Sequence, residues 1–391
     1  MTEIAPTSAQ PQAGLYVHIP FCRSRCAYCD FTTFADASLY IPRYLAALRR
    51  ELALSRAAWQ GYRFDSLYIG GGTPTILPPG ELAALVAELL DELTFTPDPE
   101  VTVEANPDSV TSAGLQTLVD AGVNRLSLGV QSWQAGELGV LGRCHSAAQA
   151  GRAIEAARFA GIRNLSLDLM LGLPGQSLAS WRDTLTHSIA YSPEHISAYT
   201  LTLEEDTQLA RSVAHGEVVL LDNEACADQY ALLRQMLAVA GYDQYELSNW
   251  ARSECGGDLR SRHNLHYWRN QPYLGLGLAA FSYDGIHRWG NSRDLAGYLA
   301  SLKRGELPPR ESEHLNAKAA LGETIMLGLR LVREGVRWES LSARFGLDAR
   351  AIYAQQIEEL AQAGWLEADD QSMRLAPRAY YLANVVLREF V

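Results

Sequence analysis

The chain has 391 residues, of which 48% are hydrophobic and 20% charged, enough apolar material for two or three domains or one large barrel. Its 45 acidic residues outnumber 33 basic ones, and the formal charge of −12 argues against an extended nucleic-acid-binding surface. Lys303 and Lys318 are the only lysines, and neither lies in a glycine-rich loop, which excludes a P-loop lysine and leaves few candidates for a Schiff base.

The beginning of the chain lacks the basic stretch and apolar run of a secretory signal, and no uncharged apolar run approaches the ~20 residues of a membrane span. We therefore expect a cytoplasmic protein in which the six cysteines are reduced. In that setting, clustered cysteines bind metal or take part in catalysis more often than they form disulfides.

Residues 1–13 are polar and without periodicity, and they predict a disordered tail. From Gly14 onward, short apolar segments alternate with amphipathic stretches. The predicted strands are Leu15–Ile19, Ser66–Ile69, Val101–Glu104, Arg125–Val130, Asn164–Met170 and His195–Thr200. The predicted helices are Tyr40–Trp59, Gly80–Glu92, Ser112–Ala121, Ala147–Ala160 and Leu178–Ala190. Six such repeats with near-continuous apolar strands predict an α/β fold, a parallel sheet covered by helices.

The rhythm changes after Leu220. One more helix, Asn223–Ala240, precedes an aromatic region with short strand-like runs at 242–291. The polar segment 305–315 contains two prolines and is the best domain boundary, which gives domains at 14–305 and 306–391.

The second domain is predicted to be mostly helical. Its expected elements are the helices Lys318–Val332, Trp338–Phe345 and Ala349–Ala363, followed by a hairpin at Gly364–Ala376. This order resembles a winged helix. From Asn316 to Val391 there are nine Lys/Arg and ten Asp/Glu residues, so a structural or lid role is favoured over DNA binding.

Three cysteines, Cys22, Cys26 and Cys29, lie directly after the first predicted strand with the spacing C-x3-C-x2-C. Thiolates hold iron–sulfur clusters, and a four-iron cluster normally takes four of them. Three ligands would leave one iron open to a substrate or cofactor. The alternatives are a zinc site completed by His18 or Asp30, and three unrelated buried thiols.

Polar residues also follow the other predicted strands. The glycines at 70–72 let the backbone approach a ligand, although such a run is often only a turn. Glu104 and Gln131 end the third and fourth strands, where each could equally be a polar strand cap. Asp168 lies inside an apolar strand, which marks it as a site candidate or as one half of an ion pair with Arg125 or Arg143.

The cysteine loop and the runs LYVHIPFC, GGGTPT, EANP, NRLSLGVQS, LGRCH and DLMLGLPGQ resemble radical S-adenosylmethionine (SAM) enzymes. The resemblance implies a partial (β/α)6 barrel whose three cysteines hold a 4Fe-4S cluster. It also implies SAM at the open iron, where an electron from the cluster would yield a 5′-deoxyadenosyl radical. The polar strand ends would then share one edge of the barrel.

The same resemblance implies a SAM site. Tyr16 would lie near the cluster-bound SAM and Tyr28 against its adenine. Gly71, Gly72 and Thr73 would contact the methionyl part. The residues that match SAM-site positions of the oxygen-independent coproporphyrinogen oxidase group are Glu104, Gln131, Arg143 and Asp168.

Two departures point to a sister branch, the HemW-type heme chaperones. True oxidases of the group carry a further cysteine where this chain has Phe31, and they have a longer N-terminal extension than the 21 residues before Cys22. The segments YELSNW (245–250) and HNLHYW (263–268) resemble that branch, and the second is associated with heme.

Histidine or tyrosine can ligate heme iron, so His263 and Tyr267 are the candidate heme residues, with Trp268 as a surface for the porphyrin. The alternative is an aromatic β-hairpin in which His263 only hydrogen-bonds a neighbour. Phe281 replaces the histidine of the family segment GxGAHS, which would alter any heme contact made there.

We therefore expect a cytoplasmic heme chaperone with a 4Fe-4S cluster, SAM and heme, a β-containing extension of the barrel and a winged-helix-like C-terminal domain. The alternatives are oxidative decarboxylation of coproporphyrinogen III and another tetrapyrrole-modifying radical reaction. No catalytic residue is assigned. A heme-acceptor protein and an electron donor are the expected partners, and a homodimer is left open. Cys144, Cys226 and Cys255 are isolated and are expected to be inert thiols.

Overall fold

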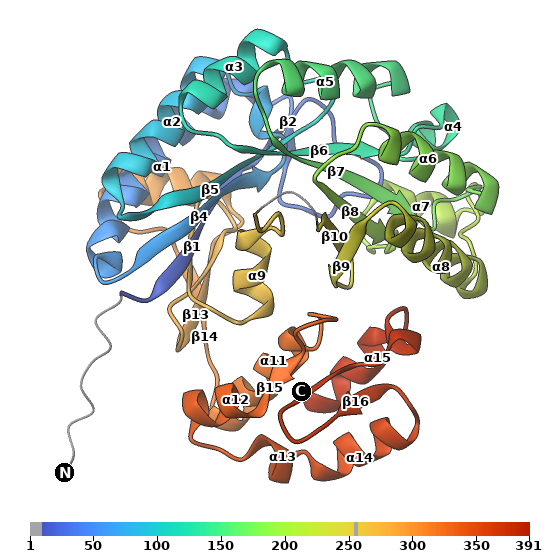
Figure 1. Cartoon of the computed structure of the whole chain (residues 1–391). Coiled ribbons are helices and arrows are strands. Elements are labelled where there is room, and N and C mark those ends of the chain that lie inside the picture. The colour runs from blue at the N-terminus through green and yellow to red at the C-terminus, as the bar shows by residue number, and fades with distance from the viewer. Residues whose placement is uncertain (1–9, 254–256) are drawn as a thin grey trace, which may run out of the picture.

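The computed structural model describes residues 10–253 and 257–391, and its largest element is a sheet of 12 strands (Figure 1). The central strands run parallel and follow the chain: β1 (Gln12–Ile19), β4 (Arg63–Gly71), β5 (Phe95–Ala105), β6 (Arg125–Gln131), β7 (Asn164–Leu171) and β8 (His195–Thr200). All seven residues of β6 are buried, as expected for a parallel strand with helices on one face and a filled interior on the other. The six predicted strands are confirmed.

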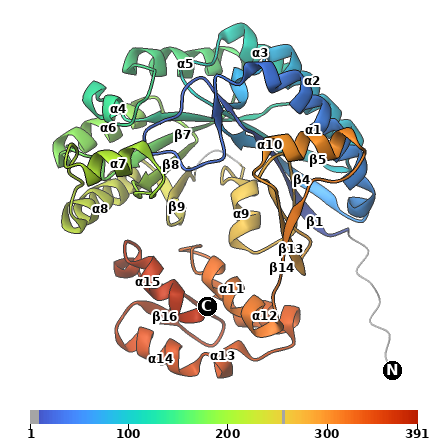
Figure 2. The ribbon, with the colours of Figure 1, turned by 180° about the vertical axis from the view of Figure 1, so that it is seen from behind.

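Helices form an outer arc around this curved sheet (Figures 1 and 2). The helices that follow the parallel strands are α1 (Ile41–Ser55), α2 (Pro79–Glu92), α3 (Ser112–Asp120), α4 (Ala135–Val140), α5 (Ala147–Phe159), α6 (Leu178–Ala190), α7 (Gln208–Ala214) and α8 (Asn223–Val239). Ser146 and Ser177 begin α5 and α6 with reciprocal capping hydrogen bonds, which fix where these helices start. The predicted helices are confirmed, with their ends shifted by a few residues.

The sheet continues beyond the six parallel strands at both edges. β10 (Asn249–Arg252) and β9 (Tyr242–Glu246) extend it beside β8. On the other side, β11 (Tyr273–Leu276) pairs parallel with β1, followed by β12 (Phe281–Tyr283), β13 (His287–Asn291) and β14 (Arg310–His314), with α10 (Leu295–Lys303) between the last two. The expected β-containing extension is therefore present as part of the main sheet.

Two expectations differ from the structure in this region. The HNLHYW segment is a helix, α9 (Arg262–Trp268), so the β-hairpin alternative was wrong; the Ser261 side chain caps it by accepting from the Asn264 amide. The boundary segment contains β14, which completes the edge of the large sheet, so the border of the sheet falls after His314 rather than at 306. Residues 1–9 of the predicted tail lie outside the described residues, while Gln12 and Ala13 already belong to β1.

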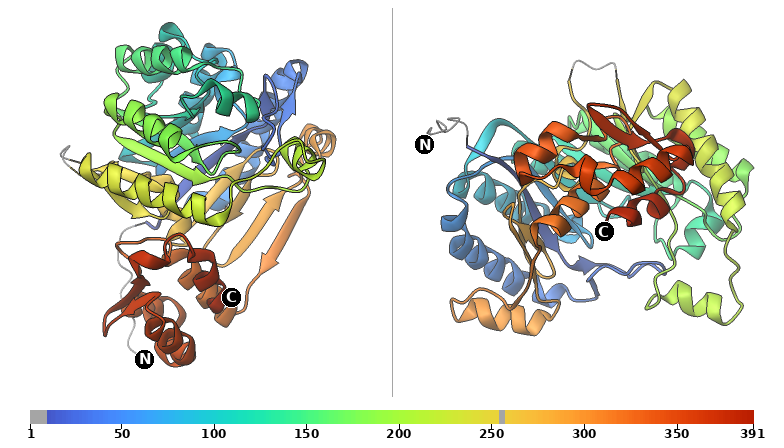
Figure 3. Two further views of the ribbon diagram at one scale, coloured as in Figure 1. Left: turned by 90° about the vertical axis from the view of Figure 1, so that its right-hand side faces the viewer. Right: turned by 90° about the horizontal axis from the view of Figure 1, so that it is seen from below.

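The C-terminal domain is a separate lobe on the hollow side of the sheet (Figures 1 and 3). It contains the helices α11 (Ala317–Gly328), α12 (Trp338–Phe345), α13 (Ala349–Ile352), α14 (Ala354–Gln362) and α15 (Ala383–Leu387). Its small sheet has the order β15 (Val336–Arg337), β17 (Ser372–Leu375) and β16 (Leu366–Ala368). The predicted third helix is split at Tyr353, and α15 was not predicted. The mostly helical, winged-helix-like character is confirmed.

Each part has its own apolar core. The barrel core lies between the sheet and its helices, and the lobe has a smaller one around residues such as Leu321, Trp338 and Phe390. The two parts meet where α11 contacts α9, and Arg288 of β13 makes a bidentate ion pair with Glu323 of α11 at 2.5 and 2.7 Å. Among the described helices, we find none long and apolar enough to span a bilayer.

Candidate functional site

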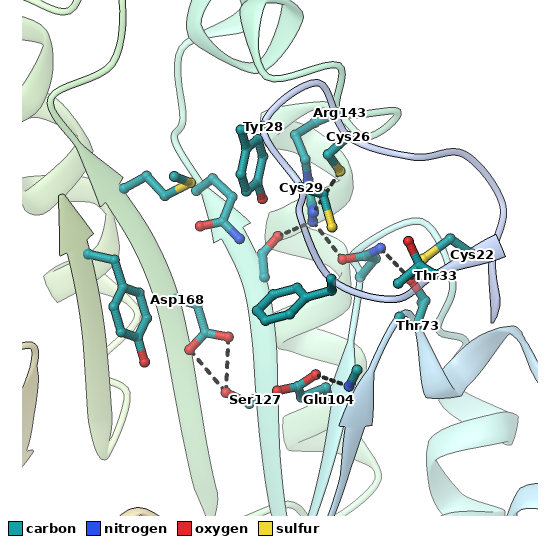
Figure 4. Close-up of a pocket in the computed structure, with 18 of the residues that line it drawn as sticks. Cys22, Cys26, Tyr28, Cys29, Thr33, Thr73, Glu104, Ser127, Arg143 and Asp168 are labelled. Carbon is teal, nitrogen blue, oxygen red and sulfur yellow. Dashed lines mark hydrogen bonds between the residues drawn. The ribbon is translucent and has the colours of Figure 1, made fainter. Parts of the chain in front are cut away.

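A cavity of about 440 Å³ opens at the carboxyl ends of the parallel strands, beneath the cysteine loop (Figure 4). It gathers most of the residues predicted from the sequence: Cys22, Cys26, Tyr28, Cys29, Gly71, Gly72, Thr73, Glu104, Gln131, Arg143 and Asp168. Most of these residues come from the loop and from β4 to β7, which meet because the strands are parallel, and Arg143 comes from the segment between α4 and α5. Tyr16, His263 and Tyr267 lie elsewhere.

The cysteine loop is tied to the rest of the barrel through its backbone. The Ala27 amide donates to the Leu141 carbonyl at 3.0 Å, and the Ala27 carbonyl accepts from the Leu209 amide at 2.8 Å. Two side chains donate to the thiols: Thr73 Oγ1 lies 3.7 Å from Cys22 Sγ, and an Arg143 guanidinium nitrogen 3.6 Å from Cys26 Sγ. The loop is therefore held with its thiols toward the cavity.

Burial raises the pKa of the Cys22 and Cys29 thiols, because the thiolate loses its hydration. These thiols therefore ionise readily only beside a positive charge or a metal. In the described part of the chain, no three His, Cys, Asp or Glu side chains converge tightly enough to hold a single metal ion. Thiolates of a 4Fe-4S cluster bind separate irons, so three thiols around one cavity fit that group.

The glycine segment after β4 packs directly against the cysteine loop. Gly71 has a φ of +108°, and a Cβ there would lie 2.4 Å from the His18 ring. A Cβ on Gly72 would lie 2.6 Å from the Phe21 carbonyl oxygen and 3.0 Å from Cys22 Sγ. Only glycine lets the backbone come this close to Cys22, so the segment leaves no side chain between the end of β4 and the cysteine loop.

A hydrogen-bonded chain connects Cys22 with Cys26 across the cavity wall. Thr73 Oγ1, beside Cys22, accepts from the Asn106 side-chain amide at 2.9 Å. The Asn106 side-chain oxygen accepts from Arg143 at 2.6 Å, and Arg143 also donates to the Gly129 carbonyl at 2.6 Å. Arg143 is therefore oriented by strand ends while it faces Cys26, and it brings a positive charge to the thiols.

The two carboxylates lie on the strand side of the cavity, opposite the loop (Figure 4). Glu104 accepts from the Tyr68 hydroxyl at 2.7 Å and from the Gly71 amide at 3.0 Å. Burial raises the pKa of Glu104 to about 7, and the nearby Asp168 adds to the shift. Glu104 is thus poised to gain or lose a proton near neutral pH.

Asp168 accepts from Ser127 Oγ at 3.0 Å through both carboxylate oxygens and from Ser166 Oγ at 3.3 Å. Burial raises its pKa as well. Neither of the ion pairs considered from the sequence forms among the described residues, because Arg143 is engaged as above and Arg125 lies nearer Glu100. Hydroxyl groups rather than a cation satisfy Asp168, so it offers a carboxylate to the cavity.

Gln131 is buried at the cavity end of β6 and has a φ of +63°, in the left-handed region. A non-glycine residue there is uncommon, and such strain gathers at functional sites. The turn directs the end of β6 along the cavity.

The sequence did not single out several residues of the cavity wall. Arg125 is 2% exposed, its guanidinium makes no hydrogen bond with the described residues, and its nearest charged partner is Glu100 at 4.0 Å. Other lining residues without a sequence signal include Tyr68, Ser127, Met170, Ser197 and Tyr199, all on strands. Which of these strand residues face the cavity depends on how the sheet curves, and the sequence does not show that.

Tyr16 and Tyr267 line a second cavity of about 500 Å³, which adjoins the first through Asp30 and Phe31. His263 lies behind it and is 1% exposed. Its Nδ1 is 3.2 Å from Ser66 Oγ, and its Nε2 is 2.9 Å from the Tyr267 hydroxyl. Both ring nitrogens of His263 therefore have a hydrogen-bond partner. This agrees with the part of the sequence alternative in which His263 only hydrogen-bonds its neighbours, although the segment is a helix and not a hairpin. Trp268 is not part of the lining and stacks beneath Arg330.

The remaining thiols do not join the three clustered ones. Cys144 is exposed, with its sulfur 3.0 Å from Ser24 Oγ, and Cys226 is a buried residue of α8. Both are free, and Cys255 lies outside the described residues.

Comparison with known proteins gives matches over nearly the whole chain. The family model described as Radical SAM superfamily matches residues 16–187, and the one described as HemN C-terminal domain matches residues 315–382. A Mycobacterium tuberculosis protein named heme chaperone HemW is 37% identical over 388 residues, covering 98% of this chain and 96% of the relative. A Synechocystis protein of the same name is 36% identical over 386 residues, covering 96% and 90%.

A Danio rerio relative, named radical S-adenosyl methionine domain-containing protein 1, mitochondrial, is 32% identical and covers 96% of this chain and 86% of its own length. Among solved structures, Escherichia coli coproporphyrinogen III oxidase (HemN), described as a radical SAM enzyme, superposes with a TM-score of 0.83. It shares 21% identity, with 97% of this chain and 90% of that chain covered, and this likeness shows the fold.

Proposed function

Because the chain belongs to the radical SAM superfamily and, within it, to the HemW branch, we propose that it is a heme chaperone that holds a 4Fe-4S cluster, SAM and heme and passes heme to an acceptor protein. The observation that carries the proposal is the first cavity, where three thiols face the carboxylates Glu104 and Asp168. An electron donor for the cluster and a cytoplasmic location belong to the same proposal.

Cys22, Cys26 and Cys29 would be the protein ligands of the cluster. When bound, a cluster with three cysteine ligands supplies an open iron and an electron that can cleave the C–S bond of SAM. Arg143 and Thr73 donate toward the sulfurs of Cys26 and Cys22, and such donors stabilise thiolate charge. The backbone at Gly72 closes the space beside Cys22 and keeps water from that side.

The SAM site would use the rest of the cavity wall. The backbone of Gly71, Gly72 and Thr73 would take the methionyl end, and Tyr28 the adenine. Glu104 and Asp168 would accept from the ammonium and ribose hydroxyls, because ionised carboxylates form the strongest hydrogen bonds with such donors, and Gln131 would accept through its amide oxygen. SAM in this role caps the cluster and need not be consumed.

Glu104 makes this site pH-dependent. If SAM binds the ionised carboxylate, a pKa of about 7 means that raising the pH from 6 to 8 strengthens SAM binding about tenfold. Glu104→Gln is expected to bind SAM more weakly at pH 8 and to lose this dependence. Anaerobic equilibrium dialysis of the reconstituted protein measures both, with Glu88→Gln, on α2 and outside the cavity lining, as a control that keeps the wild-type profile. Equal pH profiles in wild type and Glu104→Gln would contradict the assignment.

The raised pKa of Glu104 also affects the stability of the ligand-free protein, which falls as the pH rises, whereas SAM binding becomes stronger. The folded pKa of Glu104 lies above its unfolded value, so the proton stabilises the ligand-free fold, and this contribution is lost as the pH rises through about 7. The loss should be smaller in Glu104→Gln.

In this proposal Tyr267 and His263 are the heme residues. Tyr267 would contact heme directly, because it lines the second cavity. His263 would act behind it, since its Nε2 is 2.9 Å from the Tyr267 hydroxyl. A neutral His263 with its proton on Nε2 can donate to the tyrosine oxygen while Ser66 donates to Nδ1. This pair would orient the Tyr267 oxygen, while burial raises the pKa of the Tyr267 hydroxyl and keeps it protonated in the ligand-free protein.

The deciding experiment is an anaerobic spectrum of cluster-reconstituted protein with and without hemin, paired with an activity assay. We expect a stable Soret band on hemin addition and no conversion of coproporphyrinogen III. Formation of protoporphyrinogen IX would overturn the chaperone proposal in favour of the oxidase. Absence of the Soret band together with repeated SAM cleavage would favour another tetrapyrrole-modifying enzyme.

A further inference from the structure

The second cavity, here named the aromatic cavity, lies between strands β1, β11 and β12 of the large sheet and helix α11 of the C-terminal domain. Its aromatic lining is Tyr16, Phe31, Tyr267, Tyr273 and Phe281. Its volume of about 500 Å³ is in the range of cavities that bind organic cofactors.

Two of these rings are held open to solvent. Phe31, in the cysteine loop, is 62% exposed, and Phe281, in β12, is 48% exposed. The Phe281 ring rests on the adjacent strand, where a Cβ on Gly290 would lie 2.7 Å from it. Gly290 therefore covers one side of the Phe281 ring, and the rest of the ring is exposed to solvent. Large apolar side chains exposed around one cavity commonly mark a binding surface.

Two arginines, Arg288 and Arg293, line the aromatic cavity, and only one of them has a free guanidinium. Arg288 is fully engaged by Glu323 of α11. Arg293, in the turn between β13 and α10, is exposed and makes no hydrogen bond or ion pair with the described residues. A guanidinium in this position can form a bidentate pair with a carboxylate.

We propose that the aromatic cavity binds a carboxylated tetrapyrrole, with Phe31 and Phe281 against the ring and Arg293 on a propionate. A flat apolar ring matches exposed aromatic faces, and a carboxylate at its edge matches the free guanidinium. Asp30 and Phe31 line both cavities, so the bound ring lies next to the cluster and SAM site. The assignment deepens the proposed heme function and rests on it, and it makes α11 of the C-terminal domain part of the binding site.

The test compares hemin with hemin dimethyl ester, which lacks the free carboxylates, in titrations of the reconstituted full-length protein. Arg293→Ala is expected to weaken hemin binding about tenfold and to leave ester binding unchanged, because it removes only a charged contact. Phe281→Ala is expected to weaken both probes about tenfold, because it removes an aromatic face. SAM binding, measured in parallel, stays at the wild-type level in both variants and shows that the first cavity is intact.

Two matched controls lie on α5, on the outer arc of helices. Phe159 is 84% exposed and Arg152 is exposed, so Phe159→Ala and Arg152→Ala should bind both probes as the wild type does. Wild-type hemin affinity in Phe281→Ala and Arg293→Ala would overturn the assignment of the aromatic cavity and leave heme binding itself intact. A wild-type protein that binds no hemin would instead overturn the proposed function.

Discussion

Replacing Cys26 with alanine is expected to remove nearly all cluster iron from the anaerobically reconstituted protein. Two thiolates, Cys22 and Cys29, would remain for four irons, and loss of a direct ligand costs more than the 10- to 100-fold in affinity typical of supporting residues. Iron and sulfide per chain, with the visible absorption of the cluster, measure the loss.

Cys144→Ala is the matched control for this experiment. Cys144 is a free, exposed thiol beside Arg143, and its sulfur contacts Ser24 in the same cysteine loop. It should retain the wild-type iron content, because nothing in the geometry makes it a ligand. Circular dichroism of both variants verifies the fold. Unchanged iron in Cys26→Ala would contradict the ligand assignment, and equal loss in Cys144→Ala would show that the loop tolerates no change.

The sequence predicted the architecture because local patterns decide it. The apolar segments that became β1 and β4 to β8, and the amphipathic stretches between them, need no knowledge of distant contacts. The cysteine loop followed from its thiol spacing, Glu104 from its place at a strand end and Asp168 from a charge inside an apolar strand. Parallel strands bring these residues to one edge of the barrel.

What the sequence could not supply depends on contacts between distant residues. His263 lies within a motif, yet its engagement depends on Ser66, 197 positions earlier in the chain. β14 has the polar composition of a linker and becomes a strand because β13 offers it a partner. The hydroxyls around Asp168 come from adjacent strands whose pairing sets which side chains face inward.

The role of Arg125 also depends on contacts between distant residues. Replacing it with methionine is expected to lower the free energy of unfolding by about 3–5 kcal/mol. Its side chain is 2% exposed and its charged partner Glu100 is 6% exposed. The Glu100 carboxylate also accepts from the Arg262 and His263 amides at the start of α9. Without the guanidinium, that carboxylate is left buried without a cation. Urea unfolding of the cluster-free protein, followed by circular dichroism, measures the change.

The double variant Arg125→Met/Glu100→Gln separates charge burial from packing. Glutamine keeps an oxygen that can accept from the α9 amides but carries no charge, so the double variant should recover at least half of the stability lost in Arg125→Met. Arg49→Met is the solvated control: the Arg49–Glu88 pair is closer, at 2.6 Å, but its side chains are 37% and 41% exposed, so the change should cost only about 0–1 kcal/mol. A double variant no more stable than Arg125→Met would show that Arg125 contributes packing volume and that its charge compensates nothing in the barrel.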